Sequence, residues 1–153
     1  MRRISWIVFA IIPMLASTHA ISQESRIGSF DKQSIVLGYY RSGMWAETLM
    51  AKRTELAEAK QNNDQAKIKE LNGWGAASQD LAMKQLMGDA PIDNILVALK
   101  PAFEEIEKTD NLSKVVPASS DLKGPSVDVT GRLLDWLKAD ETTRKMILDL
   151  KKK

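Results

Sequence analysis

The stretch WAETLMAKRTELAEAKQNNDQAKIKEL, residues 45–71, contains neither proline nor glycine and is rich in Ala, Glu, Lys and Gln. These are strong helix formers, so the sequence predicts one long helix over about residues 44–71. Trp45, Leu49 and Leu56 recur at spacings of four and seven and give this helix an apolar stripe. At the rise of an α-helix, the segment would extend about 40 Å.

Two glycines interrupt the pattern in the segment Asn72-Gly73-Trp74-Gly75. Paired glycines commonly end one helix and let the chain reverse into another, so we expect the tip of an antiparallel helical hairpin here. Helical character resumes over residues 76–87, and after a break at 88–91 a clean amphipathic stripe runs over residues 92–106. These patterns place the hairpin at about residues 44–108.

Short strands are expected on either side of the hairpin. Residues 26–30 suit a strand and precede Asp31, a good helix N-cap, and residues 111–117 suit a second strand. Near the C-terminus, Thr130 and Asp140 are each expected to cap a helix. The predicted fold class is mainly helical α+β, with a small body of two short strands, a projecting antiparallel helical hairpin and C-terminal helices packed on the body. Two strands alone are marginal in water, so either these helices cover them or they join strands of another subunit.

The first twenty residues, MRRISWIVFAIIPMLASTHA, have the layout of a secretory signal peptide. Two arginines precede an uncharged apolar run over residues 4–16, and small and polar residues follow. This run is shorter than the roughly 20 residues that a membrane-spanning helix needs, so no stable membrane anchor is expected. We therefore predict cleavage after Ala20, a single exported domain over residues 21–153, and a periplasmic location.

The composition excludes several kinds of chemistry. There is no cysteine, and the single histidine, His19, lies within the predicted signal peptide. The remaining chain thus lacks the usual ligands of zinc, the histidine of a catalytic triad and the thiols of a redox site, and we predict no metal and no cofactor. It keeps 20 Lys or Arg and 20 Asp or Glu, a balance that argues against nucleic-acid binding.

An enzyme based on carboxylates or lysine is a further possibility. The acidic residues on the last turns of the amphipathic stripe, Glu104, Glu105, Glu107 and Asp110, are the candidates for acid and base work. Adjacent carboxylates on a helix point to different sides, so a solvated helix face accounts for them better. We therefore predict no catalytic residue and no enzymatic activity.

The order of elements resembles the Skp (OmpH-like) family of periplasmic chaperones. The resemblance lies in RIGSFD at 26–31, the charged helical hairpin, LSKVV at 112–116, and SSDLKGPSVDVTGRLLDWLK at 119–138. It implies a β body shared among three subunits that carry helical hairpins as arms, and hence a homo-oligomer with a trimer favoured. It also implies unfolded or envelope proteins as partners. This chain departs from the family in its balanced charge, its shorter hairpin with a break at 88–91, and its continuation over residues 140–153.

Two functions follow as hypotheses. One is a non-enzymatic, Skp-like holdase chaperone that shields apolar segments of unfolded envelope proteins. The alternative is an envelope adaptor or structural subunit that binds one specific partner through the hairpin. The candidate partner-binding residues are Leu49, Leu56, Trp74, Leu81, Met83 and Met87. For two kinds of residue a plainer role is available: Trp74 can fold back over the turn, and the methionines can fill the core.

Overall fold

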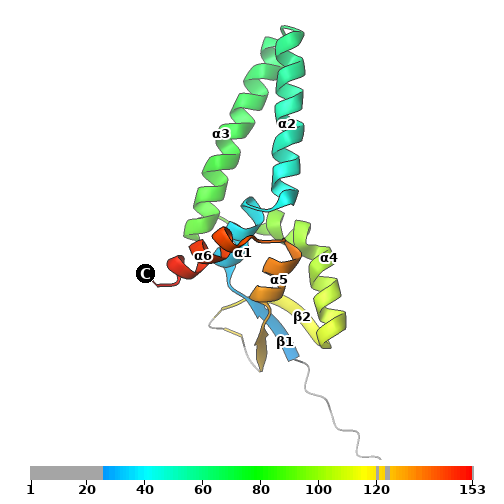
Figure 1. Cartoon of the computed structure of the whole chain (residues 1–153), viewed down its shortest axis with the longest axis vertical. Helices are drawn as coiled ribbons and strands as arrows, with labels where there is room; N and C mark the ends of the chain where they lie inside the picture. The colour runs from blue at the N-terminus through cyan, green and yellow to red at the C-terminus, as the bar shows by residue number, and fades with distance from the viewer. Residues whose placement is uncertain (1–25, 120, 123–124, 153) are drawn as a thin grey trace, which may run out of the picture.

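The computed structural model describes residues 26–119, 121–122 and 125–152; the predicted signal peptide lies outside these residues. Within these residues, nine elements follow one another: β1 (Arg26–Phe30), α1 (Lys32–Tyr40), α2 (Gly43–Gln61), α3 (Gln65–Met87), α4 (Asp93–Asp110), β2 (Leu112–Pro117), β3 (Ser126–Asp128), α5 (Thr130–Trp136) and α6 (Glu141–Leu150). The mainly helical α+β fold is confirmed. Helices α2 and α3 form an arm that projects from a body containing the sheet and the other helices (Figure 1).

The sheet has three parallel strands in the order β2-β1-β3. Gly28 of β1 pairs with Val115 on one side and with Val127 on the other. The two strands predicted from the sequence are present, but the prediction of only two strands is wrong. Strand β3 is three residues long, too short to show the alternating pattern by which strands are recognised.

The outer side of β2 is partly closed. The Val115 N–H donates to Glu107 Oε1 of α4 at 2.8 Å, and Pro117 has no N–H to donate. A further strand would therefore find few free donors along β2, which is one way in which proteins protect the edges of their sheets.

The core lies between the sheet and helices α1, α4 and α5. Its largest fully buried hydrophobic members are Phe30, Ile35, Val36, Ile95, Leu99, Val129 and Leu133. Helices α1 and α5 approach each other so closely that a Cβ on Gly38 would lie 2.6 Å from Leu134 Cδ2. This close approach accounts for a glycine within a buried helix.

The two caps expected in the C-terminal part have different outcomes. The cap at Asp140 is confirmed, because its carboxylate accepts the Thr143 N–H at 2.7 Å. The cap at Thr130 is wrong, since α5 has Val129 at its N-cap and no capping side chain. The Thr130 hydroxyl instead accepts the Asp31 N–H at 3.0 Å and so ties the start of α5 to the start of α1.

The hairpin turns earlier than the sequence suggested. Helix α2 ends at Gln61, Asn63 adopts a left-handed conformation with φ 52°, and Asp64 caps α3 by accepting the Lys67 N–H at 3.0 Å. Helix α3 then continues through both glycines to Met87. The prediction of a tip at residues 72–75 is therefore wrong. Glycine inside a helix costs only about 1 kcal/mol relative to alanine, whereas an Asn-Asn-Asp sequence supplies both a left-handed residue and a cap.

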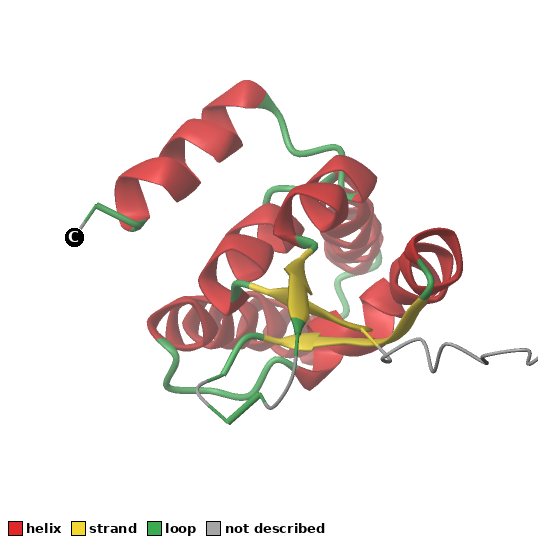
Figure 2. Ribbon diagram, turned by 90° about the horizontal axis from the view of Figure 1, so that it is seen from below, coloured by secondary structure: helices red, strands yellow, loops and turns green. Residues whose placement is uncertain are grey.

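Helix α4 belongs to the body and not to the arm. Helix α3 ends at Met87, and Gly88, with φ 87°, is its C-cap. Helix α4 then places Ile95, Leu99 and Ile106 in the core. The predicted hairpin range of 44–108 is thus corrected to an arm formed by α2 and α3 alone. Helix α6 lies at the periphery of the body (Figure 2), where Arg41 Nε donates to Thr143 Oγ1 at 2.9 Å.

Candidate binding surface on the arm

An aromatic cluster fills the base of the arm, where α1 meets α2 and α3. The Trp45 ring lies 5.0 Å from the Tyr40 ring and 6.0 Å from the Tyr39 ring, measured between centroids. It also lies 6.1 Å from the ring of Trp74 on α3. Burial raises the pKa of Tyr39, and the nearby Tyr40 adds to the effect. The cluster holds the two arm helices at a fixed spacing just above the body.

Gln85 fixes the lower end of α3. Its side chain is buried, and its Oε1 accepts the Tyr40 hydroxyl at 2.8 Å. Its Nε2 donates to the Pro91 carbonyl and to Asn94 Oδ1, both at 2.6 Å. One amide therefore joins α3 to α1 and to the start of α4, so the arm is held to the body on two sides.

A hollow of about 400 Å³ lies between α2 and α3 in the middle of the arm. The large apolar residues that line it are Leu49, Leu56, Leu71 and Trp74. The charged residues that line it, Lys52 and Arg53, are both cationic. Lys52 donates to both carboxylate oxygens of Glu55, at 2.8 and 2.9 Å, and this hydrogen bond lowers the pKa of Glu55.

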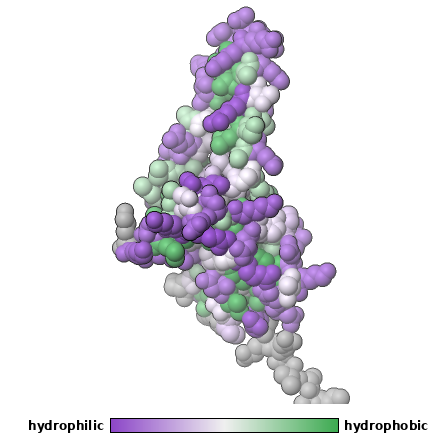
Figure 3. Space-filling model, in the orientation of Figure 1, coloured by the Kyte–Doolittle hydropathy of each residue, from purple (hydrophilic) through white to green (hydrophobic). Residues whose placement is uncertain are grey.

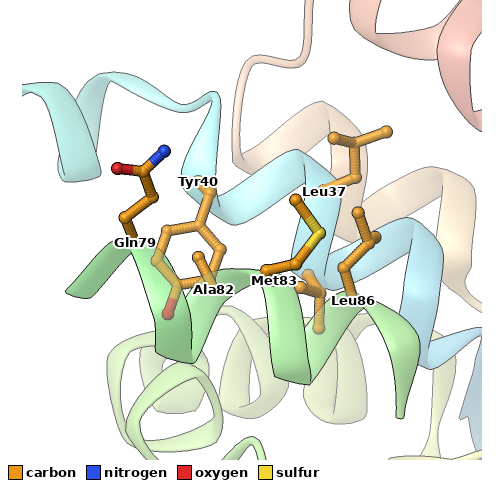
Figure 4. Close-up of a pocket in the computed structure, with 7 residues that line it drawn as sticks. Leu37, Tyr40, Gln79, Ala82, Met83 and Leu86 are labelled. Atoms are coloured by element: carbon orange, nitrogen blue, oxygen red, sulfur yellow. The ribbon is translucent and has the colours of Figure 1, made fainter. Parts of the chain in front are cut away.

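A second hollow lies at the base of the arm, between α1 and α3. Its volume is about 160 Å³ and its lining is almost entirely apolar (Figure 4). Side chains converge on it from both helices: Val36, Leu37 and Tyr40 from α1, and Gln79, Ala82, Met83 and Leu86 from α3.

A third hollow, of about 300 Å³, connects the other two. It shares Leu49 and Gly75 with the mid-arm hollow, and Tyr40 and Ala82 with the basal hollow, while Gln79 lines all three. We call these three adjoining hollows the arm groove. Apolar surface bordered by hydrophilic residues is visible along one face of the arm in Figure 3. The groove spans α3 from Leu71 to Leu86, about 22 Å at the rise of an α-helix.

The structure brings four of the six predicted partner-binding residues into this groove. Leu49, Leu56 and Trp74 are half-buried in the mid-arm hollow, and Met83, 52% exposed, lines the basal hollow. Leu81 and Met87 are exposed on α3 but lie outside the groove as defined. Trp74 lies well down α3 instead of at the tip, so the location predicted for it is wrong.

Sequence reasoning missed most of the groove residues on α3, including the three that line more than one hollow. Gly75, Gln79 and Ala82 are separated by four and three positions, which places them on one helix face. The signal was therefore present as a stripe of small or neutral side chains. This stripe can be recognised only if α3 is taken as one helix that continues through Gly73 and Gly75.

The described part of the chain shows no group of three or more His, Cys, Asp or Glu side chains placed to hold a metal ion. Among the same residues, no helix has the length and apolar character needed to cross a bilayer. Comparison of the chain with protein-family models, with curated proteins and with solved structures gave no match.

Proposed function

We propose that this chain is a non-enzymatic binding protein, exported to the periplasm, whose arm shields apolar segments of unfolded envelope proteins. In this account it is a holdase of the Skp-like type and needs neither nucleotide nor metal. The proposal rests on the arm groove and on the amount of apolar side chain that the arm leaves uncovered.

The arm leaves most of its side chains exposed, including apolar ones. Along its 19 residues α2 buries only Ala59, and along its 23 residues α3 buries only Leu71 and Gln85. Met83, which lines the basal hollow of the groove, is 52% exposed. Covering apolar surface is worth roughly 25 cal/mol per Å², so a partner that lies in the groove gains from contacts that the described residues do not make with one another.

Flexible side chains suit varied partners. Met83 reaches the basal hollow, and the unbranched thioether of methionine adapts its shape to what it contacts. One groove covers only one side of a client, so several arms would enclose it better. A homo-oligomer, with a trimer favoured, is accordingly part of the proposal.

An adaptor that binds one partner is the second candidate. The observation that favours it is the set of hydrogen bonds around Gln85, which holds the base of the arm in one arrangement. A preformed groove loses little conformational entropy on binding and suits a partner of fixed shape.

The two functions differ in the range of partners, since a holdase binds many unfolded proteins and an adaptor binds one, and an aggregation assay separates them. The chain lacking residues 1–20 would be mixed with three unrelated proteins diluted from denaturant, and light scattering would be followed. A holdase suppresses the aggregation of all three, and Met83→Ser in the groove weakens this effect. Met50→Ser, on the exposed face of α2 outside the groove, serves as the matched control and leaves it unchanged.

Failure to suppress the aggregation of any of the three proteins would contradict the holdase function. The solution mass of the same chain, by light scattering after size exclusion, tests the oligomer. A trimer supports enclosure by several arms, and a clean monomer favours the adaptor.

A further inference from the structure

Two glycines inside α3 have no evident role in the fold. Apart from its chain neighbours and the nearby backbone of α3, a Cβ added to Gly73 or to Gly75 would meet no atom of the described residues within 4 Å, so neither glycine allows a close approach of two elements. Neither has a positive φ, since among the described glycines that conformation belongs to Gly88. Because glycine weakens the interior of a helix relative to alanine, both positions reduce the stability of the arm without a contact that explains them.

The two glycines differ in their surroundings. Gly75 lines both the mid-arm hollow and the connecting hollow, whereas Gly73 lines neither of them. The absence of a side chain at Gly75 leaves the backbone of α3 exposed in the wall of the groove. An alanine methyl group here would project into space that is now open. Gly75 therefore provides room for an occupant that does not belong to the described chain.

The charges at this point of the groove have one sign. Lys52 is paired with Glu55 at 2.8 Å, but Arg53 is exposed and makes no ion pair with any residue that the structure describes. Among the described residues, none that lines the mid-arm hollow is acidic. An apolar surface thus adjoins a guanidinium group that is free to pair with a carboxylate.

We propose that the arm groove binds an extended apolar segment of another polypeptide across Gly75, with a carboxylate of that segment paired to Arg53. An apolar side chain of the segment enters the space that the absent Cβ leaves open. This inference rests on the proposed function and specifies the class of segment that the groove accepts.

A pair of alanine substitutions tests the site at Gly75. Both Gly75→Ala and Gly73→Ala are expected to raise the melting temperature, because alanine favours the helix. The probe is a labelled peptide of about nine residues, alternating Leu and Ser and ending in two Asp, which spans about 30 Å when extended. Its affinity, measured by fluorescence anisotropy, should fall about tenfold in Gly75→Ala, as expected when a methyl group is forced into a filled site. Gly73→Ala should bind it as the unaltered chain does.

A second peptide, ending in two Lys instead of two Asp, tests the pairing with Arg53. The acidic peptide should bind about fivefold more tightly at low salt, the size of effect that one exposed ion pair gives. Arg53→Gln should abolish this preference. Equal binding of the two peptides, or undiminished binding to Gly75→Ala, would overturn the inference.

The same measurements separate this inference from the proposed function. Suppression of aggregation without binding of either peptide would overturn the inference and leave the holdase function intact. Peptide binding that depends on Gly75 and Arg53, without suppression of aggregation, would support the inference and exclude the holdase in favour of the adaptor.

Discussion

Trp45 of α2 and Trp74 of α3 lie with their ring centroids 6.1 Å apart and their ring planes inclined by 30°. Trp45 also packs edge-on against Tyr40 of α1, with centroids 5.0 Å apart. These contacts connect the middle of the arm to the body. Trp74 therefore has two roles: it packs against Trp45 within the arm, and it lines the groove.

Trp74→Ala is expected to lower the free energy of unfolding by about 1–2 kcal/mol, less than the cost at a fully buried aromatic residue because Trp74 is only half-buried. Urea denaturation measures this change, and a double-mutant cycle with Trp45→Ala should show a coupling of about 0.5–1.5 kcal/mol. Met50→Ala, at an exposed position of α2, is the control and should change the stability by less than about 0.5 kcal/mol. Strictly additive effects of the two tryptophan substitutions would contradict direct packing.

Proline substitutions locate the turn of the hairpin. Gln65 is the first residue of α3, a position that proline favours, and the φ of −78° and ψ of 88° of the preceding Asp64 lie outside the α region that a following proline disfavours. Gln65→Pro should therefore retain the helix content, whereas Gly73→Pro in the helix interior should cost about 3 kcal/mol. Circular dichroism and denaturation measure both. The reverse order of effects would place the turn at residues 72–75 after all.

Gln85→Ala is expected to lower the free energy of unfolding by about 2–3 kcal/mol, because it removes three hydrogen bonds and leaves partly buried groups without partners. Tyr40→Phe removes only the bond to the amide oxygen and should cost about 1 kcal/mol. Thermal denaturation of the two variants gives the comparison. Equal and small effects would show that the amide does not hold the base of the arm.

Asp128 gives the stability a dependence on acid pH. Hydrogen bonds from the Thr130 hydroxyl and N–H lower the pKa of Asp128, against the opposing effect of burial. A carboxylate whose pKa is lowered by folding stabilises the folded state fully above its unfolded pKa of about 4. This contribution is lost as the pH falls through the pKa of the folded state. The stability difference between the unaltered chain and Asp128→Asn should thus be full near neutral pH and shrink below about pH 4. A difference that grows on acidification would contradict this assignment.

Much of the body follows from local patterns in the sequence. Asp31 and Asp140 can be recognised as N-caps because their carboxylates accept hydrogen bonds from residues that follow them closely in the sequence. The strands that begin at Arg26 and Leu112 are long enough to show β character. Strand β3 has only three residues and is held by pairing with β1, which is a contact distant in sequence. The role of Thr130 is hidden for the same reason, since its partner Asp31 lies 99 residues away.

The sequence contains two competing turn signals for the hairpin, one at residues 62–64 between α2 and α3 and one at the glycines within α3. The glycines at 73 and 75 are the stronger signal by residue type, but a helix tolerates them at modest cost. Asn63 and Asp64 satisfy the backbone at the turn more fully, through a left-handed residue and a side-chain cap. With the turn misplaced, Gly75, Gln79 and Ala82 could not be assigned to one face, and the groove that they line could not be predicted.

Hydrogen–deuterium exchange in the presence of an unfolded protein tests the central claim most directly. The account predicts that a bound unfolded chain slows exchange on both sides of the groove, in α2 around residues 49–56 and in α3 over residues 71–86. It predicts no change in α4 or in strands β1 and β2. Binding with protection confined to the body, or with no protection in the arm, would contradict the assignment of the arm groove as the binding surface.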